Sequence, residues 1–271
     1  MEADTKYPIF MVHGMGYRDH KHLGYWGRIP KVLEANGAKV YFSGQDSNGS
    51  VEGNARQLEK RLNEVLKESC AEKVNIIAHS KGGLESRYLI STMGYADKIA
   101  SLTTLSTPHN GSVTVDKLLK FPAAPVKAGC KVCDLWFRIL GDKSPDTYSA
   151  INLFRTDTME KFNAENPDME GPYYQSYGFV MKRAFGDITM CIPWLVVNAF
   201  EGENDGLLAP RAVKWTNFKG VYSGNSSRGI SHCDEVDMRR WGFKIKSDNA
   251  AYDDITAFYL DIVRDLKNMG F

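Results

Sequence analysis

Apolar runs and amphipathic segments alternate along the first hundred residues of the chain. The apolar runs are short and rich in β-branched or aromatic residues, which predicts strands at Tyr7–Val12, Ala38–Phe42, Val74–Ala78 and Ile99–Leu105. The segments between them carry apolar residues at helical spacing, first at Trp26, Ile29, Val32 and Leu33 and then at Leu58, Leu62, Val65 and Leu66. This alternation predicts an α/β protein with a mostly parallel central sheet flanked by helices. Sheets of this kind place their chemistry at the carboxyl ends of the strands.

The pattern changes after Gly111, and up to about Asp187 the sequence predicts helices and loops. One apolar stripe runs through Val132, Leu135, Trp136 and Ile139, and Thr156-Asp157 with Glu160 is typical of a helix start. Strand character returns at Trp194–Phe200, and Ile255–Leu266 predicts a closing helix. We therefore expect a single domain over residues 1–271, with a helical cap or lid insertion at approximately residues 108–190.

Composition and charge exclude several classes of protein. A hydrophobic content of 43% allows a full core, while 34 basic against 33 acidic residues give a net charge of +1 and no reason to expect a nucleic-acid partner. No stretch approaches the roughly 18 apolar residues of a transmembrane helix. The first residues, Met1–Lys6, lack the features of a secretion signal, so we expect a soluble protein, either intracellular or a mature form carrying an added start Met. Five cysteines are too few for a disulfide framework.

A nucleophilic serine is predicted where the third strand ends. Ala78-His79-Ser80-Lys81-Gly82 has small residues two positions either side of Ser80, and a helical pattern follows from Leu84 to Ile90. Strand, sharp turn and helix form the nucleophile elbow of serine hydrolases, in which the flanking positions must be small. The five-residue pattern alone also occurs in ordinary turns, but its place after the third strand favours the elbow.

The remaining members of a catalytic triad must follow the serine in the order acid, then histidine. Two histidines lie beyond Ser80, and His109 precedes the candidate acids, which leaves His232 as the base. The loop after Trp194–Phe200 offers Asp205 as the acid, with Glu201 and Glu203 as alternatives. Gly206 favours Asp205 because it permits a tight turn there.

The first strand ends in a turn that suits an oxyanion hole. His13-Gly14-Met15-Gly16 follows it, which predicts the backbone N–H groups of Met15 and Lys81 as the oxyanion donors. Because the backbone donates, the side chains at these two positions need not matter. His13 fits a hydrogen-bonded structural role better than that of a catalytic base.

Several motifs together resemble a known family. Thr5–Ile9 with Val12–Met15, Ala78–Gly83, Asn204–Leu207 and His232–Asp237 are similar to bacterial triacylglycerol lipases of the Pseudomonas, Burkholderia and Proteus type, as are Ala150–Asn163 and Tyr173–Tyr177. The likeness spans nearly the whole chain. It implies an α/β-hydrolase fold, the triad of Ser80, Asp205 and His232, oxyanion donors at Met15 and Lys81, and activity on acylglycerols beneath a movable helical lid.

The resemblance also implies a metal site, although the chemistry itself requires no cofactor. Members of this group often carry a structural calcium near the catalytic histidine, and Asp187 and Asp234 match two of its carboxylate ligands. Where the family supplies a Gln, four residues after Asp234, this chain has Met238. Calcium requires six or more oxygen ligands, so that substitution removes one of them.

Alternative functions remain compatible with the sequence. The leading hypothesis is a lipase or carboxylesterase acting on lipid esters or small-molecule esters, with transient contact to a lipid–water interface. The same triad could serve a thioesterase, phospholipase or acyltransferase, and a catalytically silent binding protein would keep only the fold. Cys130 and Cys133 form a Cys-x2-Cys pair, which is more typical of cap packing than of a metal site without a second pair.

Overall fold

A six-stranded parallel sheet forms the centre of the protein. The computed structural model describes residues 2–16, 24–120, 122–139, 142–224, 226–239 and 254–271. The strands are β1 (Ile9–Val12), β2 (Val40–Phe42), β3 (Val74–His79), β4 (Ile99–Leu105), β5 (Tyr173–Phe179) and β6 (Phe218–Tyr222), in the order β2-β1-β3-β4-β5-β6. Every pairing in this order is parallel, which confirms the predicted α/β architecture.

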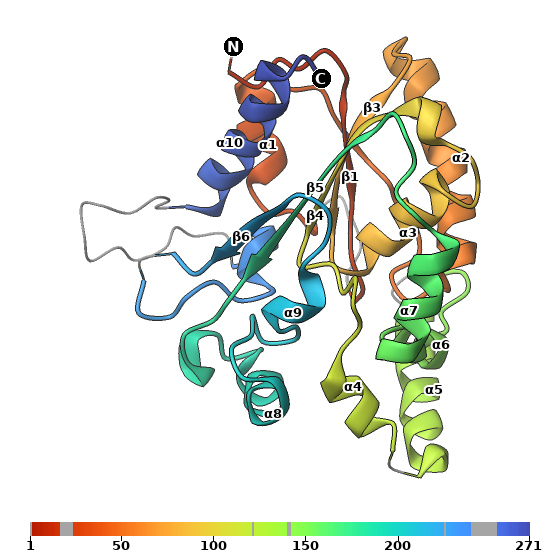
Figure 1. The fold of residues 1–271 in the computed structure, drawn as a ribbon, viewed down its shortest axis with the longest axis vertical. Coiled ribbons are helices and arrows are strands. Elements are labelled where there is room, and N and C mark those ends of the chain that lie inside the picture. The colour runs from red at the N-terminus through yellow and green to blue at the C-terminus, as the bar shows by residue number, and fades with distance from the viewer. Residues whose placement is uncertain (1, 17–23, 121, 140–141, 225, 240–253) are drawn as a thin grey trace.

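Helices cover both faces of the sheet. Helices α1 (Ile29–Ala35) and α10 (Ile255–Asn268) lie on one face, and α2 (Val51–Ser69) and α3 (Lys81–Ile90) lie on the other (Figure 1). Strand β1 shows why both faces are apolar. Ile9 and Met11 pack toward α1 and α10, whereas Phe10 and Val12 pack toward α2 and α3. Successive strand side chains point to opposite faces, so a strand buried on both sides is an uninterrupted apolar run.

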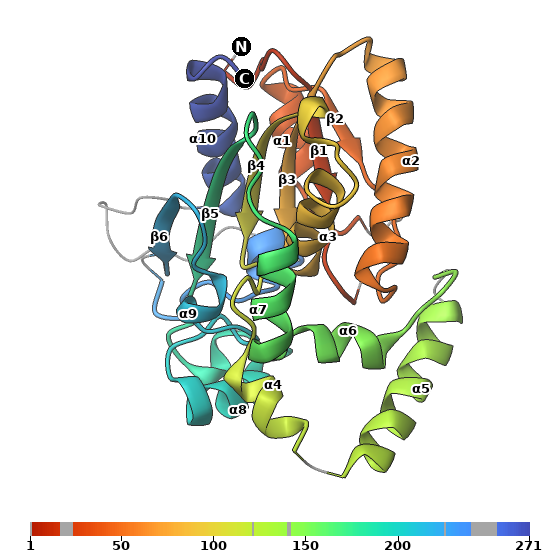
Figure 2. The same ribbon diagram turned by 45° about the vertical axis from the view of Figure 1, so that its right-hand side comes forward.

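The helical segment after β4 is shorter than predicted. Helices α4 (Val113–Leu118), α5 (Ala123–Ile139), α6 (Thr147–Leu153) and α7 (Thr156–Glu165) lie between β4 and β5, toward the carboxyl ends of the strands (Figure 2). The predicted insertion at residues 108–190 therefore contains β5, which belongs to the central sheet. In β5 the sequence Tyr-Tyr-Gln-Ser-Tyr-Gly-Phe mixes polar and apolar residues. It therefore lacks the uninterrupted apolar run by which a buried strand is predicted.

The predicted strand at Trp194–Phe200 is wrong, because these residues belong to helix α8 (Cys191–Glu201). An apolar run of this length fits a strand and a helix equally well by pattern alone. The flanking residues favour a helix: Pro193 lies in its first turn, and Gly202 follows it with a positive φ of 83°. Strand β6 was not predicted, because it alternates between exposed and half-buried positions at the edge of the sheet.

Short helical turns connect the remaining parts. They are η1 (Ala96–Lys98), η2 (Ala184–Gly186), η3 (Asp234–Val236) and helix α9 (Pro210–Val213). Among the described residues, no helix has both the length and the apolar character that crossing a bilayer requires.

Candidate active site

Ser80 lies at a strained turn between β3 and α3. Its backbone has φ 52° and ψ −130°, a region that residues with a side chain rarely occupy. Two neighbours hold it there: the Ser80 N–H donates to the Leu105 carbonyl at 2.9 Å, and the Thr107 hydroxyl donates to the Ser80 carbonyl at 2.8 Å. The strain is a property of a nucleophile elbow, in which the serine side chain is presented at the end of the strand.

Glycines allow the first turn and the elbow to approach each other. A Cβ on Gly14 would lie 2.7 Å from the Ser80 Cβ, and one on Gly82 would lie 2.5 Å from the His13 carbonyl oxygen. Strands β1 and β3 are adjacent and in register, Val12 opposite Ala78, so the chain segments that follow them must share the same space. Any larger residue at Gly14 or Gly82 would force these segments apart.

Asp205 and His232 meet beyond the end of β5. His232 Nδ1 lies 2.8 Å from Asp205 Oδ2, and the His232 N–H donates to the Asp205 carbonyl, also at 2.8 Å. Their loops are held by the same residue, because Met181 forms antiparallel bridges with both Asn204 and Gly229. The structure thus brings together the predicted acid and base, which lie 27 residues apart in the chain.

The surroundings of Asp205 keep its carboxylate ionised. Burial alone would raise the pKa of Asp205, but its electrostatic interaction and hydrogen bond with His232 lower it, and the N–H groups of Leu207 and Leu208 donate to Oδ1 at 2.8 Å. The net effect is a pKa below the ordinary value. A buried carboxylate on Nδ1 fixes the imidazole tautomer that leaves Nε2 available as a base.

The two alternative acids have other surroundings. Glu201 accepts hydrogen bonds from Ser112 and Thr114, each at 2.8 Å, and so caps helix α4. Glu203 is exposed. Neither contacts His232 among the interactions that the structure describes.

A second polar cluster lies behind His232. Tyr25 Oη is 2.7 Å from His79 Nδ1, His79 Nε2 is 3.1 Å from Glu235 Oε2, and the rings of His79 and His232 lie 4.4 Å apart. Burial and then the charge of Asp205 raise the pKa of Glu235 well above its usual range, while burial lowers that of His79. Burial thus disfavours the charged form of both groups.

His79, His232 and Glu235 have metal-ligating atoms within 4.8 Å of one another. Both ring nitrogens of His79 and Nδ1 of His232 are already in hydrogen bonds, to Tyr25, Glu235 and Asp205 respectively. A metal ion would have to displace these bonds, so the cluster fits a hydrogen-bonded support for the His232 ring better than a metal centre.

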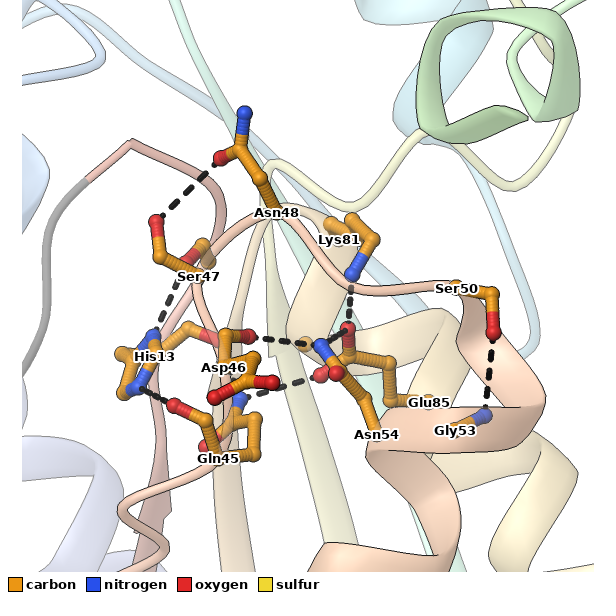
Figure 3. A network of polar contacts seen from close by, with 12 residues as sticks. His13, Gln45, Asp46, Ser47, Asn48, Ser50, Gly53, Asn54, Lys81 and Glu85 are labelled. Carbon is orange, nitrogen blue, oxygen red and sulfur yellow. Dashed lines mark hydrogen bonds and ion pairs between the residues drawn. The ribbon is translucent and has the colours of Figure 1, made fainter. Parts of the chain in front are cut away.

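A buried network joins Lys81, a predicted oxyanion donor, to His13 at the end of β1, two residues before the other predicted donor, Met15 (Figure 3). Gln45 Nε2 donates to the His13 carbonyl and to Glu85, at 2.9 Å in each case, and Glu85 forms an ion pair with Lys81. Asn54 adds a hydrogen bond to Glu85 at 2.6 Å. His13 contacts the Gln45 carbonyl through Nε2 at 3.1 Å, in keeping with its predicted structural role.

The prediction used only the backbone N–H of Lys81, but its side chain is fully buried in the structure. Burial raises the pKa of Glu85, and the Lys81 ammonium opposes that rise. The four-residue spacing of Lys81 and Glu85 on a helix could have indicated the pair. The part played by Gln45 could not have been predicted, since it follows β2 and reaches the site only through the fold.

Ser80 and His232 open into one cavity of about 430 Å³, which Met15 also lines. Most of its other wall residues are apolar, and they come from several elements: Val115 of α4, Phe154 after α6, Met190 before α8, Leu207 and Leu208 of the acid loop, and Val236 of η3. The helical segment thus supplies part of the wall. An apolar cavity ending at a few polar groups is suited to an acyl chain whose polar bond lies at one end.

The two candidate calcium ligands lie close to the His232 loop. Asp187 accepts a hydrogen bond from Ser231 at 2.6 Å, and Asp234 forms an ion pair with Arg239. Cys130 is buried, but the side chain of Cys133 lies outside the described residues, as do those of Trp136 and of Val132 in the predicted stripe. The Cys-x2-Cys pair stays a prediction.

Comparison with known proteins gives the family. A model of the family described as palmitoyl protein thioesterase matches residues 8–167, which is more than half of the chain. The chain belongs to this family. The matched region includes β1 to β4, the elbow and helices α4 to α7.

The individual proteins to which the chain is similar include lipases. "Triacylglycerol lipase 2" of Saccharomyces cerevisiae is 29% identical over 273 residues, covering 94% of this chain and 77% of that protein. A triacylglycerol lipase of Burkholderia plantarii is 40% identical over 119 residues, covering 42% of this chain and 33% of that protein. The Staphylococcus hyicus lipase structure superposes with a TM-score of 0.68 at 16% identity, covering 98% of each chain.

These similarities confirm the resemblance to bacterial triacylglycerol lipases and the α/β-hydrolase fold. They identify the chain as an ester hydrolase of the lipase and esterase class.

Proposed function

We propose that this chain hydrolyses fatty-acyl carboxylic esters with Ser80 as nucleophile, His232 as base and Asp205 as the orienting acid. The observation that carries the proposal is the 2.8 Å contact of His232 Nδ1 with the buried Asp205 carboxylate, beside the cavity that contains Ser80. Each residue comes from a different part of the chain. Their order along the chain is that of serine ester hydrolases of this fold, Ser80 and His232 line the same cavity, and Asp205 contacts His232.

The reaction follows from these positions. His232 takes the Ser80 proton as the hydroxyl oxygen attacks the ester carbonyl carbon, and the N–H groups of Met15 and Lys81 bind the oxyanion. The alcohol leaves with the proton from His232, which gives an acyl-enzyme. Water, deprotonated by His232, then attacks the acyl carbon and releases the carboxylic acid.

An acylglycerol or a similar lipid ester is the substrate class we favour. The apolar cavity wall suits a fatty-acyl chain. Large apolar side chains are also exposed along the chain on either side of the cavity residue Met190: Phe185 (76%), Ile188 (81%), Ile192 (74%) and Leu195 (51%) precede or belong to α8, and Leu207 (40%) lines the cavity itself. We infer that this apolar rim contacts a lipid–water interface transiently.

A fluorophosphonate probe tests the nucleophile. We expect labelling of the wild-type protein, no labelling of Ser80→Ala, and a fall in ester hydrolysis of at least about 10³-fold in that variant. Ser91→Ala is the matched control, because Ser91 caps the other end of the same helix, and it should be labelled normally. Equal labelling of Ser80→Ala and wild type would exclude Ser80.

Nitrophenyl esters from acetate to palmitate, together with emulsified triglyceride, test the substrate class. We expect hydrolysis of long-chain esters and of the emulsion. Activity limited to short soluble esters would keep the esterase mechanism and reject the lipase one.

A fatty-acyl thioesterase is the second candidate, and the family match favours it. The same triad can attack a thioester carbonyl, and the thiolate is the better leaving group. Comparing palmitoyl-CoA with nitrophenyl palmitate decides between them: a kcat/KM much higher for the thioester would favour this candidate.

A further inference from the structure

The side chain of Arg239 contacts Asp187 and Asp234, the two carboxylates that match calcium ligands. Arg239 Nε donates to Asp234 Oδ1 at 2.7 Å, and its Nη2 donates to the other oxygen of the same carboxylate. Nη1 donates to the Gly186 carbonyl at 3.2 Å, and Nε lies 4.0 Å from Asp187 Oδ2. One guanidinium thus contacts both segments that would surround a metal ion.

The remaining oxygen atoms are occupied as well. Asp187 Oδ1 accepts hydrogen bonds from the N–H and the hydroxyl of Thr189, and Oδ2 accepts one from the Ser231 hydroxyl at 2.6 Å. All four carboxylate oxygens of the two candidate ligands thus already accept hydrogen bonds.

These donors do not fit a calcium ion while Arg239 is in place. Calcium requires six to eight oxygen ligands, whereas both oxygens of Asp234 and the Gly186 carbonyl already bind N–H groups. The family's Gln position carries Met238, which packs against the core and offers only a thioether. A divalent cation at this point would also lie against the positive guanidinium.

We propose that the Arg239 guanidinium takes the place of the structural calcium in this protein. It supplies a permanent positive charge between Asp187, just before α8, and Asp234, two residues after His232. Asp234 is the first residue of η3, which directly follows His232. By binding both Asp234 and the Gly186 carbonyl, Arg239 links the His232 loop to the segment at Gly186–Thr189. A side-chain cation does this at any calcium concentration.

Thermal unfolding of the wild-type protein is the first test. We expect the same Tm, to within about 1 °C, in excess EDTA and in millimolar calcium chloride, and no stoichiometric calcium in protein purified without chelator. A lower Tm in EDTA, or bound calcium at one ion per chain, would overturn the proposal.

Arg239→Ala is the second test. Removing one partner leaves two carboxylates uncompensated, so we expect Tm to fall by roughly 5 °C, and calcium to raise it again because the oxygens are now available. Arg264→Ala is the control: Arg264 pairs with Asp261 and Glu2 at the surface, and its loss should change neither Tm nor the response to calcium. A wild-type Tm for Arg239→Ala would contradict the proposal.

If Arg239→Ala does not fold, Arg239→Lys provides the comparison. Lysine keeps the charge but loses the two-pronged contact with Asp234, so its Tm should be lower than that of wild type and insensitive to EDTA. All these measurements follow unfolding and metal content. Their failure would leave the proposed ester hydrolysis untouched, and the reverse also holds.

Discussion

Two oppositely charged side chains behind the elbow are buried as a pair. Lys81 and Glu85 are the clearest pair, since both are almost completely buried and lie directly behind the elbow. Breaking a buried ion pair leaves one charge in an apolar environment, which costs far more than the pair itself contributes. The proposed oxyanion donor at Lys81 therefore carries a side chain whose burial depends on Glu85.

Replacing Lys81 by Met should lower the free energy of unfolding by about 3 kcal/mol, because it strands the Glu85 carboxylate. Adding Glu85→Gln should recover more than half of that loss, since it removes the uncompensated buried charge while its amide oxygen still accepts the hydrogen bond from Asn54. Urea unfolding measures both. Lys98→Met removes an exposed ion pair with Asp97 and should leave stability unchanged. Equal stability of Lys81→Met and wild type would show that the pair is unimportant.

The same variant should show a distinct dependence on pH. The folded-state pKa of Glu85 is raised by burial, so as pH rises above about 4.3 the unfolded chain loses the Glu85 proton before the folded one does. Stability then falls with rising pH until the folded group also ionises. Without Lys81 this fall extends to higher pH, so Lys81→Met should lose stability relative to wild type between about pH 5 and pH 7. A constant difference over this range would contradict the assignment.

At the scale of elements, α8 combines an apolar sequence with an exposed surface. Of its eleven residues only Cys191 and Val197 are buried, while Ile192 and Leu195 face solvent. A helix that is apolar on its open side has a surface suited to lipid rather than to water. Met190, just before α8, and Leu207, in the loop after it, both line the cavity. The exposed apolar surface of α8 is therefore joined in the chain to the cavity wall at both ends.

Ile192→Gln combined with Leu195→Gln should lower the hydrolysis rate of emulsified triglyceride by about tenfold, since each side chain loses apolar area that binding to lipid would bury. The kcat/KM for a soluble short-chain nitrophenyl ester should stay within about twofold, because neither residue lines the cavity. Met269→Gln is the control: it changes an exposed apolar residue beyond the far end of α10 and should affect neither rate. Parallel loss on both substrates would indicate misfolding instead of lost interface contact.

At the scale of the whole molecule, Arg28 joins distant parts of the chain. It contacts Asp237 and Asp254, 209 and 226 residues away, with its closest contact to each at 2.6 Å. Asp254 is the N-cap of α10, and Arg28 precedes α1, so the two helices on one face of the sheet share this link. Hydrogen bonds to Asp237 and then to Asp254 raise the pKa of Arg28 further above its already high value.

Arg28→Ala should lower the free energy of unfolding by about 1 kcal/mol, a figure reduced for the partial exposure of this side chain. Denaturant unfolding at two salt concentrations measures the loss, which should shrink at high salt. Arg155→Ala removes an exposed pair with Asp157 and should leave stability unchanged. Identical behaviour of the two variants would mean that the link between α1 and α10 contributes nothing.

The sequence by itself determined the elements whose pattern is local. Strands β1, β3 and β4 are runs buried on both faces, and β2 is a short, half-buried apolar run at the edge of the sheet. The elbow at Ser80 needs only a strand, small neighbours and a helix. The order of Ser80, Asp205 and His232 likewise follows from the chain alone. Periodicity of two or 3.6 residues records which side of an element is buried, so such features can be predicted without a structure.

The tertiary structure decided the features that depend on which segments meet. A seven-residue apolar run is compatible with strand or helix by periodicity alone, and in the structure it is part of helix α8. Glu201 and Asp205 are similar candidates in sequence, but the fold brings Ser112 and Thr114 to the first and His232 to the second. Arg239 reaches Gly186 across 53 residues. Contacts of this kind do not show as a periodic pattern in the sequence, because the partners are distant in the chain and only the folding of the sheet brings them together.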